Sequence, residues 1–145
     1  MEWQDPGAGP DEPARWKAIA CLAPLGHDPQ RVVVVEDDAL TVDLLVDVLA
    51  EAGYTATVLY SPLGAHREIA RLQPRAILLD LELPYCSGAA LLRELKADPA
   101  TAGIPIVVVS AHTETLARED VALLAAMMPK PFPPQALLTT LQAAA

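Results

Sequence analysis

The clearest pattern in the chain is a series of short apolar runs, each followed by a stretch with helical spacing. The runs at residues 32–35 and 76–79 are apolar at every position. Unbroken runs of this length are typical of strands buried on both faces of a parallel sheet. The sequence therefore predicts strands at residues 32–35, 55–60, 76–80, 104–110 and 127–129.

Helix signals lie between these strands. Gly53 would end the first helix, whose apolar face we assign to Leu40, Leu44, Leu45, Val48, Leu49 and Ala52. Ser61 followed by Pro62 is typical of a helix cap and first turn, and Ser87 should cap the third helix. We expect helices at about residues 40–52, 62–72, 88–98, 113–125 and 134–143.

Strict alternation of strand and helix predicts an α/β fold, a doubly wound five-stranded parallel sheet with helices on both faces. Right-handed crossovers favour the flavodoxin-like strand order 2-1-3-4-5. In this order the first and third strands are neighbours at the switch point. The carboxyl end of the first strand, with Glu36 and Asp37, would then lie beside Asp80 at the end of the third.

The chain has 145 residues, which suits one domain with a substantial core. Residues 1–29 are rich in Pro and Gly, so we interpret them as a flexible extension that docks, if at all, through Trp16, and residues 30–145 as the folded domain. Cys21 and Cys86 lack metal or redox spacing, so we expect them to be free thiols.

Charge and hydropathy exclude several classes of function. The net charge of −9 argues against a nucleic-acid partner, because a nucleic-acid footprint needs a basic patch. No apolar run approaches the roughly 20 residues of a membrane helix, and the acidic N-terminus does not resemble a signal peptide. We therefore expect a cytoplasmic protein without a membrane partner.

The acidic residues at the predicted sheet edge suggest a cation site. Asp37, Asp80 and Glu36 would repel one another there, at about 1–4 kcal/mol for each pair at ~4 Å. Mg²⁺ prefers hard oxygen ligands of this kind and keeps water ligands that a phosphate can replace. The alternative is that Asp37 and Asp38 only cap the first helix.

Two further side chains end predicted strands at the same edge. Lys130 lies between two prolines after the fifth strand, and its compact ammonium can approach a single oxygen. Ser110 ends the fourth strand and presents a hydroxyl group. Taken singly, the lysine is equally a solvated surface charge and the serine an ordinary residue at a strand end.

In this order, the motifs resemble the receiver domain of two-component response regulators over residues 31 to about 142. The resemblance rests on motifs that each follow a strand. They are Glu36-Asp37; Asp80 with Leu83-Pro84 and Gly88; Ser110-Ala111; and Lys130-Pro131-Phe132.

The resemblance implies a role for each matched residue. Asp80 would accept a phosphoryl group from a sensor histidine kinase or a phosphotransfer protein. Mg²⁺, or Mn²⁺ in its place, would be held by Asp37, Asp80 and the backbone carbonyl of Glu82, with Glu36 acting through water. Ser110 and Lys130 would contact phosphoryl oxygens. Glu82, Ala111, His112 and Met127 stand at positions that modulate the response, and Glu82 and His112 would flank an attacking water.

The resemblance also implies how such a domain signals. It is no enzyme beyond self-catalysed phosphotransfer and autodephosphorylation, and it acts on a downstream protein or forms a homodimer through the face of the fourth helix, fifth strand and last helix. This face departs from the family pattern, since Met127 replaces an aromatic residue, Pro129 lacks an N–H group, and the segment between Ser110 and Lys130 is short. The Lys130–Pro131 peptide bond should be cis, and Pro129 should turn its nitrogen to the open edge.

Three alternatives remain at this point. The chain could be a receiver-like docking module that is not phosphorylated and has an impaired switch, or a fragment of a larger regulator. A phosphohydrolase of the haloacid-dehalogenase type would need an Asp-x-Asp motif after the first strand, where this chain has Glu36-Asp37-Asp38-Ala39.

Overall fold

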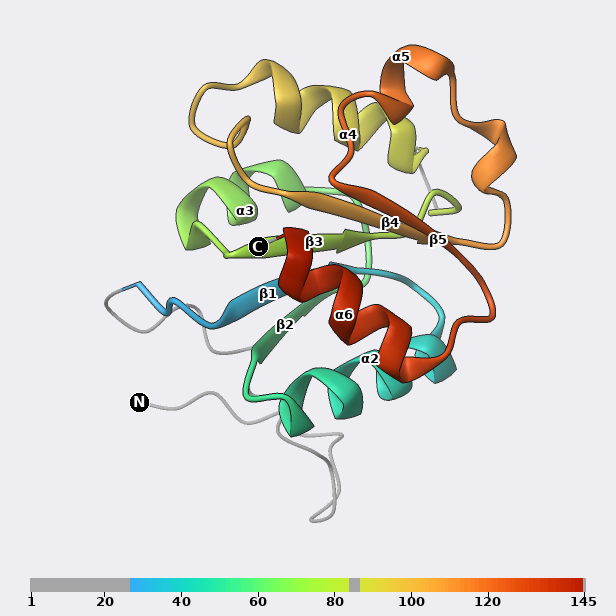
Figure 1. Cartoon of the computed structure of the whole chain (residues 1–145). Coiled ribbons are helices and arrows are strands. Elements are labelled where there is room, and N and C mark those ends of the chain that lie inside the picture. The colour runs from blue at the N-terminus through green and yellow to red at the C-terminus, as the bar shows by residue number, and fades with distance from the viewer. Residues whose placement is uncertain (1–26, 84–86, 145) are drawn as a thin grey trace.

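The computed structural model describes residues 27–83 and 87–144. Strands and helices alternate along it (Figure 1). The elements are β1 Arg31–Val35, α2 Ala39–Glu51, β2 Thr55–Leu59, α3 Ala65–Leu72, β3 Ala76–Leu79, α4 Gly88–Ala97, β4 Ile106–Ser110, the 3-10 turn η1 Thr113–Thr115, α5 Arg118–Val121, β5 Ala126–Pro129 and α6 Pro134–Ala144.

The strands form one five-stranded parallel sheet in the order β2-β1-β3-β4-β5, which confirms the predicted fold class. In β1 and β3, Val32 pairs with Ala76 and Val35 with Leu79. Because the pairing stays in register to the strand ends, the next residues, Glu36 and Asp80, emerge side by side. The register therefore assembles the acidic edge predicted from the sequence.

The valines of β1 explain why the strand runs are apolar at every position. Val32 and Val34 pack with α2 and α6 on one face, whereas Val33 and Val35 pack with α3 and α4 on the other. Figure 1 shows the helices divided between the two faces in this way. All four valines are fully buried, each worth roughly 1.5–3 kcal/mol relative to exposure.

Helix α2 forms as predicted, but it buries a different face. Asp38 is its N-cap, and Gly53 follows its end at a positive φ of 90°. Leu40 is 79% exposed, Leu44 is 41% exposed and Ala52 is also exposed, so the assignment of these three residues to the buried face is wrong. The residues that turn toward the sheet are Val42, Leu45, Val46, Val48 and Leu49.

Helix α3 begins later than the Ser61-Pro62 pair predicts. The hydroxyl oxygen of Ser61 accepts a hydrogen bond from the Leu63 N–H at 3.1 Å, which closes a local turn. Gly64 then adopts a left-handed conformation with φ of 75°, and the helix begins at Ala65. The serine therefore stabilises a turn before the helix, and the predicted start was three residues too early.

The connection between β4 and β5 is the largest departure from the predicted elements. One helix over residues 113–125 was expected, but the chain forms η1 and the short α5 instead. Leu116 and Ala117 between them are extended. A helix over all of residues 113–125 would run directly into β5 at Ala126 and leave no residues for the turn between them.

The end of β5 agrees with the sequence. The Lys130–Pro131 bond is cis, as predicted. The Lys130 N–H donates to the carbonyl of Ser110 at 2.9 Å, while Ser110 itself pairs with Pro129. Since alternate residues of a strand bond to opposite sides, Pro129 turns its nitrogen away from β4 and toward the open edge.

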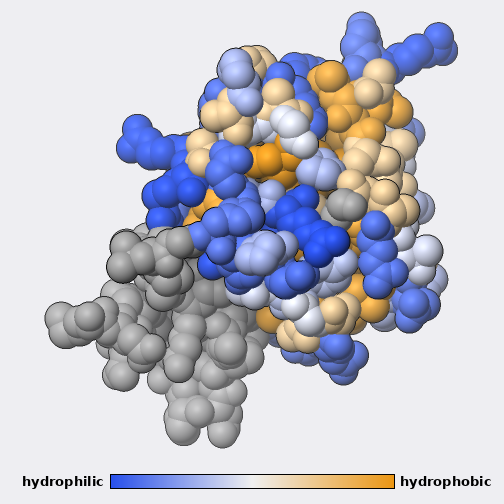
Figure 2. All heavy atoms as spheres, turned by 60° about the vertical axis from the view of Figure 1, so that its left-hand side comes forward, coloured by the Kyte–Doolittle hydropathy of each residue, from blue (hydrophilic) through white to orange (hydrophobic). Residues whose placement is uncertain are grey.

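The opposite edge, where the strands begin, carries hydrophilic side chains with hydrophobic ones beside them (Figure 2). Arg75 donates to the side chain of Gln30 at 3.0 Å, and its guanidinium lies 5.6 Å from the centre of the Tyr54 ring. His27 contacts the carbonyl of Gln73 at 2.9 Å. These polar side chains therefore interact with groups at the same edge. The residues predicted to form a functional site lie at the opposite edge, where the strands end.

Some predictions concern residues outside those that the structure describes. The extension through residue 26, with Trp16 and Cys21, lies there, as do Pro84 and Cys86. Within the described part, no helix is both long enough and apolar enough to cross a membrane.

Candidate functional site

Asp80 follows directly on β3 at the carboxyl edge of the sheet. Its N–H donates to the Val35 carbonyl at 3.0 Å, which continues the pairing with β1 by one residue. Its carboxylate oxygen Oδ1 accepts from the Glu82 N–H at 3.3 Å. The residue is only 7% exposed, so its carboxylate is largely buried at the carboxyl edge of the sheet.

Three carboxylates meet at this point. Glu36, Asp37 and Asp80 each place one oxygen within 4.8 Å of the others. Glu36 and Asp80 are buried, whereas Asp37 is exposed. The strand order therefore brings together the acidic residues that the sequence singled out.

Asp38 has the capping role that had been an alternative for both aspartates after β1. Its Oδ2 accepts from the N–H of Thr41 at 2.9 Å and from the Thr41 hydroxyl at 2.6 Å. These bonds lower the pKa of Asp38. Asp37, one residue earlier, joins the acidic group, so the two neighbours do different work.

Glu36 is the most buried member of the group, at 2% exposure. Its Oε1 accepts from the Lys130 ammonium at 2.5 Å, but its buried Oε2 has no hydrogen-bond partner. Burial, and after it the neighbouring Asp80, raise the pKa of Glu36 to about 8, although Lys130 acts in the opposite direction. The carboxylate is thus short of a partner.

Lys130 reaches the acidic group, where its ammonium lies closer to Glu36 than to Asp80. Its ammonium lies 3.8 Å from Asp80 Oδ2, against 2.5 Å from Glu36. Motif spacing gave no signal for this pairing, which depends on how deeply Glu36 is buried beside the ammonium.

The donor set of this group fits a divalent cation. All three ligands are carboxylate oxygens, the hard ligands that Mg²⁺ and Mn²⁺ take. A cation would also give the unpartnered Glu36 Oε2 a countercharge nearby. Within the described ranges, this is the group of acidic, histidine or cysteine side chains that could hold a metal.

Ser110 and Ala111 lie at the end of β4, on the far side of β3 from β1. Ser110 is fully buried, and its hydroxyl oxygen accepts from the His112 N–H at 3.1 Å. The hydroxyl hydrogen is therefore free to donate elsewhere. Ala111 is exposed directly after it, and Met127 on β5 is 38% exposed.

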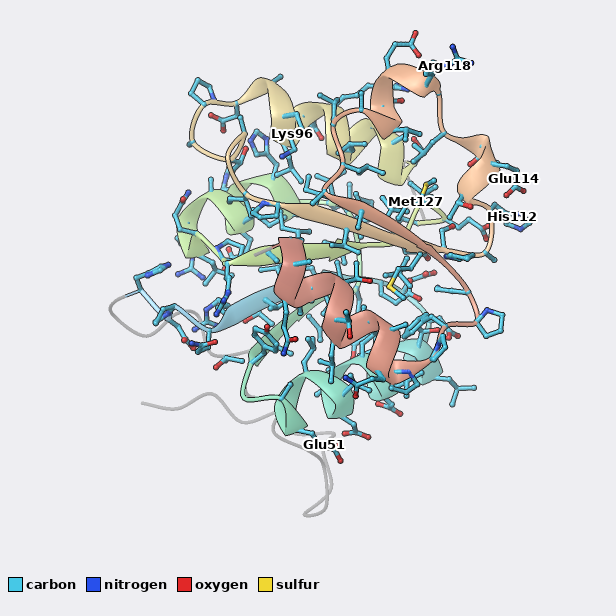
Figure 3. All side chains as sticks on the ribbon, viewed as in Figure 1. Glu51, Lys96, His112, Glu114, Arg118 and Met127 are labelled. Atoms are coloured by element: carbon cyan, nitrogen blue, oxygen red, sulfur yellow. The ribbon has the colours of Figure 1, made fainter. Side chains whose placement is uncertain are left out.

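His112 connects two carboxylates near the site. Its Nε2 lies 3.1 Å from Glu82 Oε1, which brings together the two residues predicted to flank an attacking water. Its Nδ1 lies 3.3 Å from Glu114 Oε1. Figure 3 shows His112 and Glu114 together beyond the end of β4. Sequence reasoning missed Glu114, because its place depends on the tight turn of η1.

A second unpredicted contact connects α4 to α5. Arg93 donates from Nε to Asp120 Oδ1 at 3.1 Å and from Nη2 to Oδ2 at 2.7 Å. The Asp120 side chain is 7% exposed and the Arg93 side chain is 59% exposed. This bidentate ion pair connects the short α5 to α4.

Comparison with known proteins gives a consistent picture. The family model described as the response regulator receiver domain matches residues 32–142. The chain is 35% identical over 119 residues to the DNA-binding response regulator MtrA of Mycolicibacterium paratuberculosis, covering 79% of this chain and 50% of that protein. It thus spans about half the length of such curated relatives.

Solved structures show the same similarity. A sensor protein from Polaromonas sp. JS666 superposes with a TM-score of 0.73 at 31% identity, covering 80% of this chain and 94% of that one. The receiver domain of the sensor histidine kinase PA1611 from Pseudomonas aeruginosa PAO1, with a magnesium ion coordinated in its active site cleft, gives 0.73 at 27% identity, covering 81% and 98%.

Proposed function

This chain belongs to the response regulator receiver domain family, a signalling family, and on that premise we propose that Asp80 accepts a phosphoryl group. The donor would be a phosphohistidine on a histidine kinase or a phosphotransfer protein. The observation that carries the proposal is the convergence of three carboxylate oxygens within 4.8 Å at Asp80, with the Lys130 ammonium beside them.

In the proposed reaction, a carboxylate oxygen of Asp80 attacks the phosphorus in line with the leaving imidazole nitrogen. The O–P bond forms, the N–P bond breaks, and the imidazole leaves with the electron pair of that bond. Phosphoryl transfer needs mainly positioning and neutralisation of charge on the equatorial oxygens. The hydrogen bond from the Asp80 N–H to the Val35 carbonyl positions Asp80. The groups around Asp80 would neutralise the negative charge on the phosphoryl oxygens.

Lys130 and Ser110 are the neighbours that the chain itself supplies. Once Asp80 carries a phosphoryl group, the ammonium of Lys130 has a stronger anionic partner than Glu36, and we propose that it shifts to a phosphoryl oxygen. The hydroxyl of Ser110 donates to another oxygen. Both moves begin from the ends of β4 and β5, which is where a signal to a partner would start.

We propose Mg²⁺ as the cofactor, with Mn²⁺ as a substitute. Asp37, Asp80 and the backbone carbonyl of Glu82 would hold the ion, and Glu36 would act on it through water. When bound, the ion neutralises the negative charge of the phosphoryl group and of the carboxylates that surround it. The protein itself orients Asp80 and places Lys130 beside it.

The proposal extends to partners and location. We propose that phosphorylation changes contacts with a downstream protein or a second copy through the face of α5, β5 and α6, and that the protein works in the cytoplasm. Met127 and Pro129 on this face depart from the family pattern. We therefore propose that the contacts of this face change on phosphorylation in a way that differs from other receiver domains.

Phosphorylation by a small donor tests the function. Incubation with acetyl phosphate should add one phosphate to the chain in the presence of Mg²⁺ and none in the presence of EDTA, as measured by intact mass. A chain that stays unmodified in both conditions would instead support the docking module that acts without phosphorylation.

A further inference from the structure

Gly88 makes the closest backbone approach to the proposed phospho-acceptor. It is the first residue of α4, and its N–H donates to the Leu81 carbonyl at 2.9 Å. A Cβ atom built there would lie 2.2 Å from the carbonyl oxygen of Asp80 and 2.7 Å from the Leu81 Cα. Real Cβ contacts essentially never fall below 3.0 Å, so no side chain fits without a backbone shift.

The need for glycine at this position is steric rather than conformational. Gly53 and Gly64 adopt positive φ angles, which favour glycine whatever surrounds them. Gly88 has no such angle and lies in a helix, where alanine is normally the better residue. What excludes alanine is the backbone of Asp80 and Leu81, which cannot rotate aside as a flexible side chain would.

The Asp80 peptide is therefore fixed from two sides. On one side, its N–H bonds to Val35 of β1. On the other, the first turn of α4 lies against its carbonyl oxygen. Helix α4 is itself anchored, because Leu91, Leu92 and Leu95 are fully buried in the core beneath the sheet. A methyl group at Gly88 must therefore move the Asp80–Leu81 peptide, the start of α4, or both.

We propose that Gly88 is a positioning residue for Asp80, whose missing side chain lets α4 hold the acceptor carboxylate in place beside Glu36, Asp37 and Lys130. The inference rests on the proposed function, because it assigns a cause to the geometry of that same site. Since metal and phosphoryl sites need their ligands held within roughly 0.5 Å, even a small shift of this peptide weakens them.

Two alanine substitutions of equal chemistry test this. Gly88→Ala adds a methyl group against Asp80, whereas Gly103→Ala adds one where no atom lies within 4 Å. Leu141→Ala is a third variant, which removes a fully buried side chain of α6 on the other face of the sheet and adds no atom near Asp80. The full chain of each variant is titrated with MgCl2 by isothermal calorimetry, and its stability is measured by urea unfolding.

We expect Gly88→Ala to fold and to bind Mg²⁺ at least tenfold more weakly than the wild type, with acetyl phosphate labelling slowed to match. Gly103→Ala and Leu141→Ala should keep wild-type Mg²⁺ affinity. Wild-type affinity in Gly88→Ala would overturn the inference, as would equal losses in Gly88→Ala and Leu141→Ala, or a Gly88→Ala chain that fails to fold. A wild type that binds no Mg²⁺ would overturn the proposed function itself.

Discussion

The protonation of Glu36 depends on its burial and on its two neighbours, Asp80 and Lys130. It is buried, only one of its oxygens is paired, and its pKa is raised from 4.5 to about 8. An acid whose folded pKa is raised favours the protonated form in the folded state. The folded chain therefore binds a proton more tightly than the unfolded chain between these two values.

The first prediction follows from this linkage. Without metal, the free energy of unfolding should fall as the pH rises from about 4.5 to 8, by on the order of a few kcal/mol, because only the unfolded state releases the proton freely in this window. Urea unfolding in EDTA across this range measures it. Glu36→Gln should flatten the slope, and a variant with the wild-type slope would show that another group is responsible.

The second prediction concerns the lifetime of the phosphoryl group. His112 lies between the carboxylates of Glu82 and Glu114, and an imidazole beside a carboxylate can orient an attacking water. Replacing Glu82 and His112 together with Ala should change the dephosphorylation rate several-fold, as followed by loss of the phosphorylated mass. Glu51→Ala on α2 is the distant control, and an unchanged lifetime in the double variant would exclude the role.

At this scale, the sequence predicts which residues meet but not which bonds they make. Asp37, Asp80 and Glu36 were predictable because each follows a strand, and parallel strands end at one edge. The Lys130–Glu36 pair was not, since the carboxyl groups of Glu36 and Asp80 both lie within reach of the ammonium and motif spacing does not choose between them.

Among the elements, the helices show where periodicity succeeds and where it fails. The limits of α2 follow from its cap and its glycine, but its buried face was assigned too far toward Leu40 and Leu44. A helix with apolar residues on two adjacent faces can bury either face, and their spacing alone does not show which one packs against the sheet. Between β4 and β5, neither η1 nor α5 has a side-chain cap in the structure, and both stay short.

The third prediction tests the corrected face of α2. Leu49 is fully buried, so Leu49→Ala should lower the free energy of unfolding by about 2–5 kcal/mol. Leu40 is 79% exposed, and Leu40→Ala should change it by no more than about 0.5 kcal/mol. Urea unfolding distinguishes the two, and similar costs for both would mean that the helix packs by a different face.

The fourth prediction concerns the pair that holds α5. Asp120→Ala removes both acceptors of the Arg93 guanidinium, so α5 should open more often. Hydrogen exchange of the amides of residues 122–124 should become several-fold faster, while the amides of β1 stay protected. Glu119→Ala, at the exposed neighbouring position, is the matched control; exchange rates equal to the control would show that the pair does not stabilise α5.

For the whole molecule, the topology is what makes the site. The strand order 2-1-3-4-5 was predictable because alternating buried strands and helices leave few solutions. That order places the ends of β1 and β3 together, with β4 and β5 beside them, so the motifs far apart in sequence converge. The details that escaped prediction, such as α5 and Glu114, lie on the connections, where tertiary packing rather than periodicity decides.

The measurement that tests the central claim most directly is the site of phosphorylation. The wild type, Asp80→Asn and Asp47→Asn are incubated with acetyl phosphate and Mg²⁺, and intact mass is recorded over time. Asp47 is an exposed aspartate on α2 away from the acidic group, so its variant controls for loss of one carboxylate. We predict one added phosphate on the wild type and on Asp47→Asn and none on Asp80→Asn. Equal labelling of Asp80→Asn would contradict the assignment of Asp80 as the phospho-acceptor.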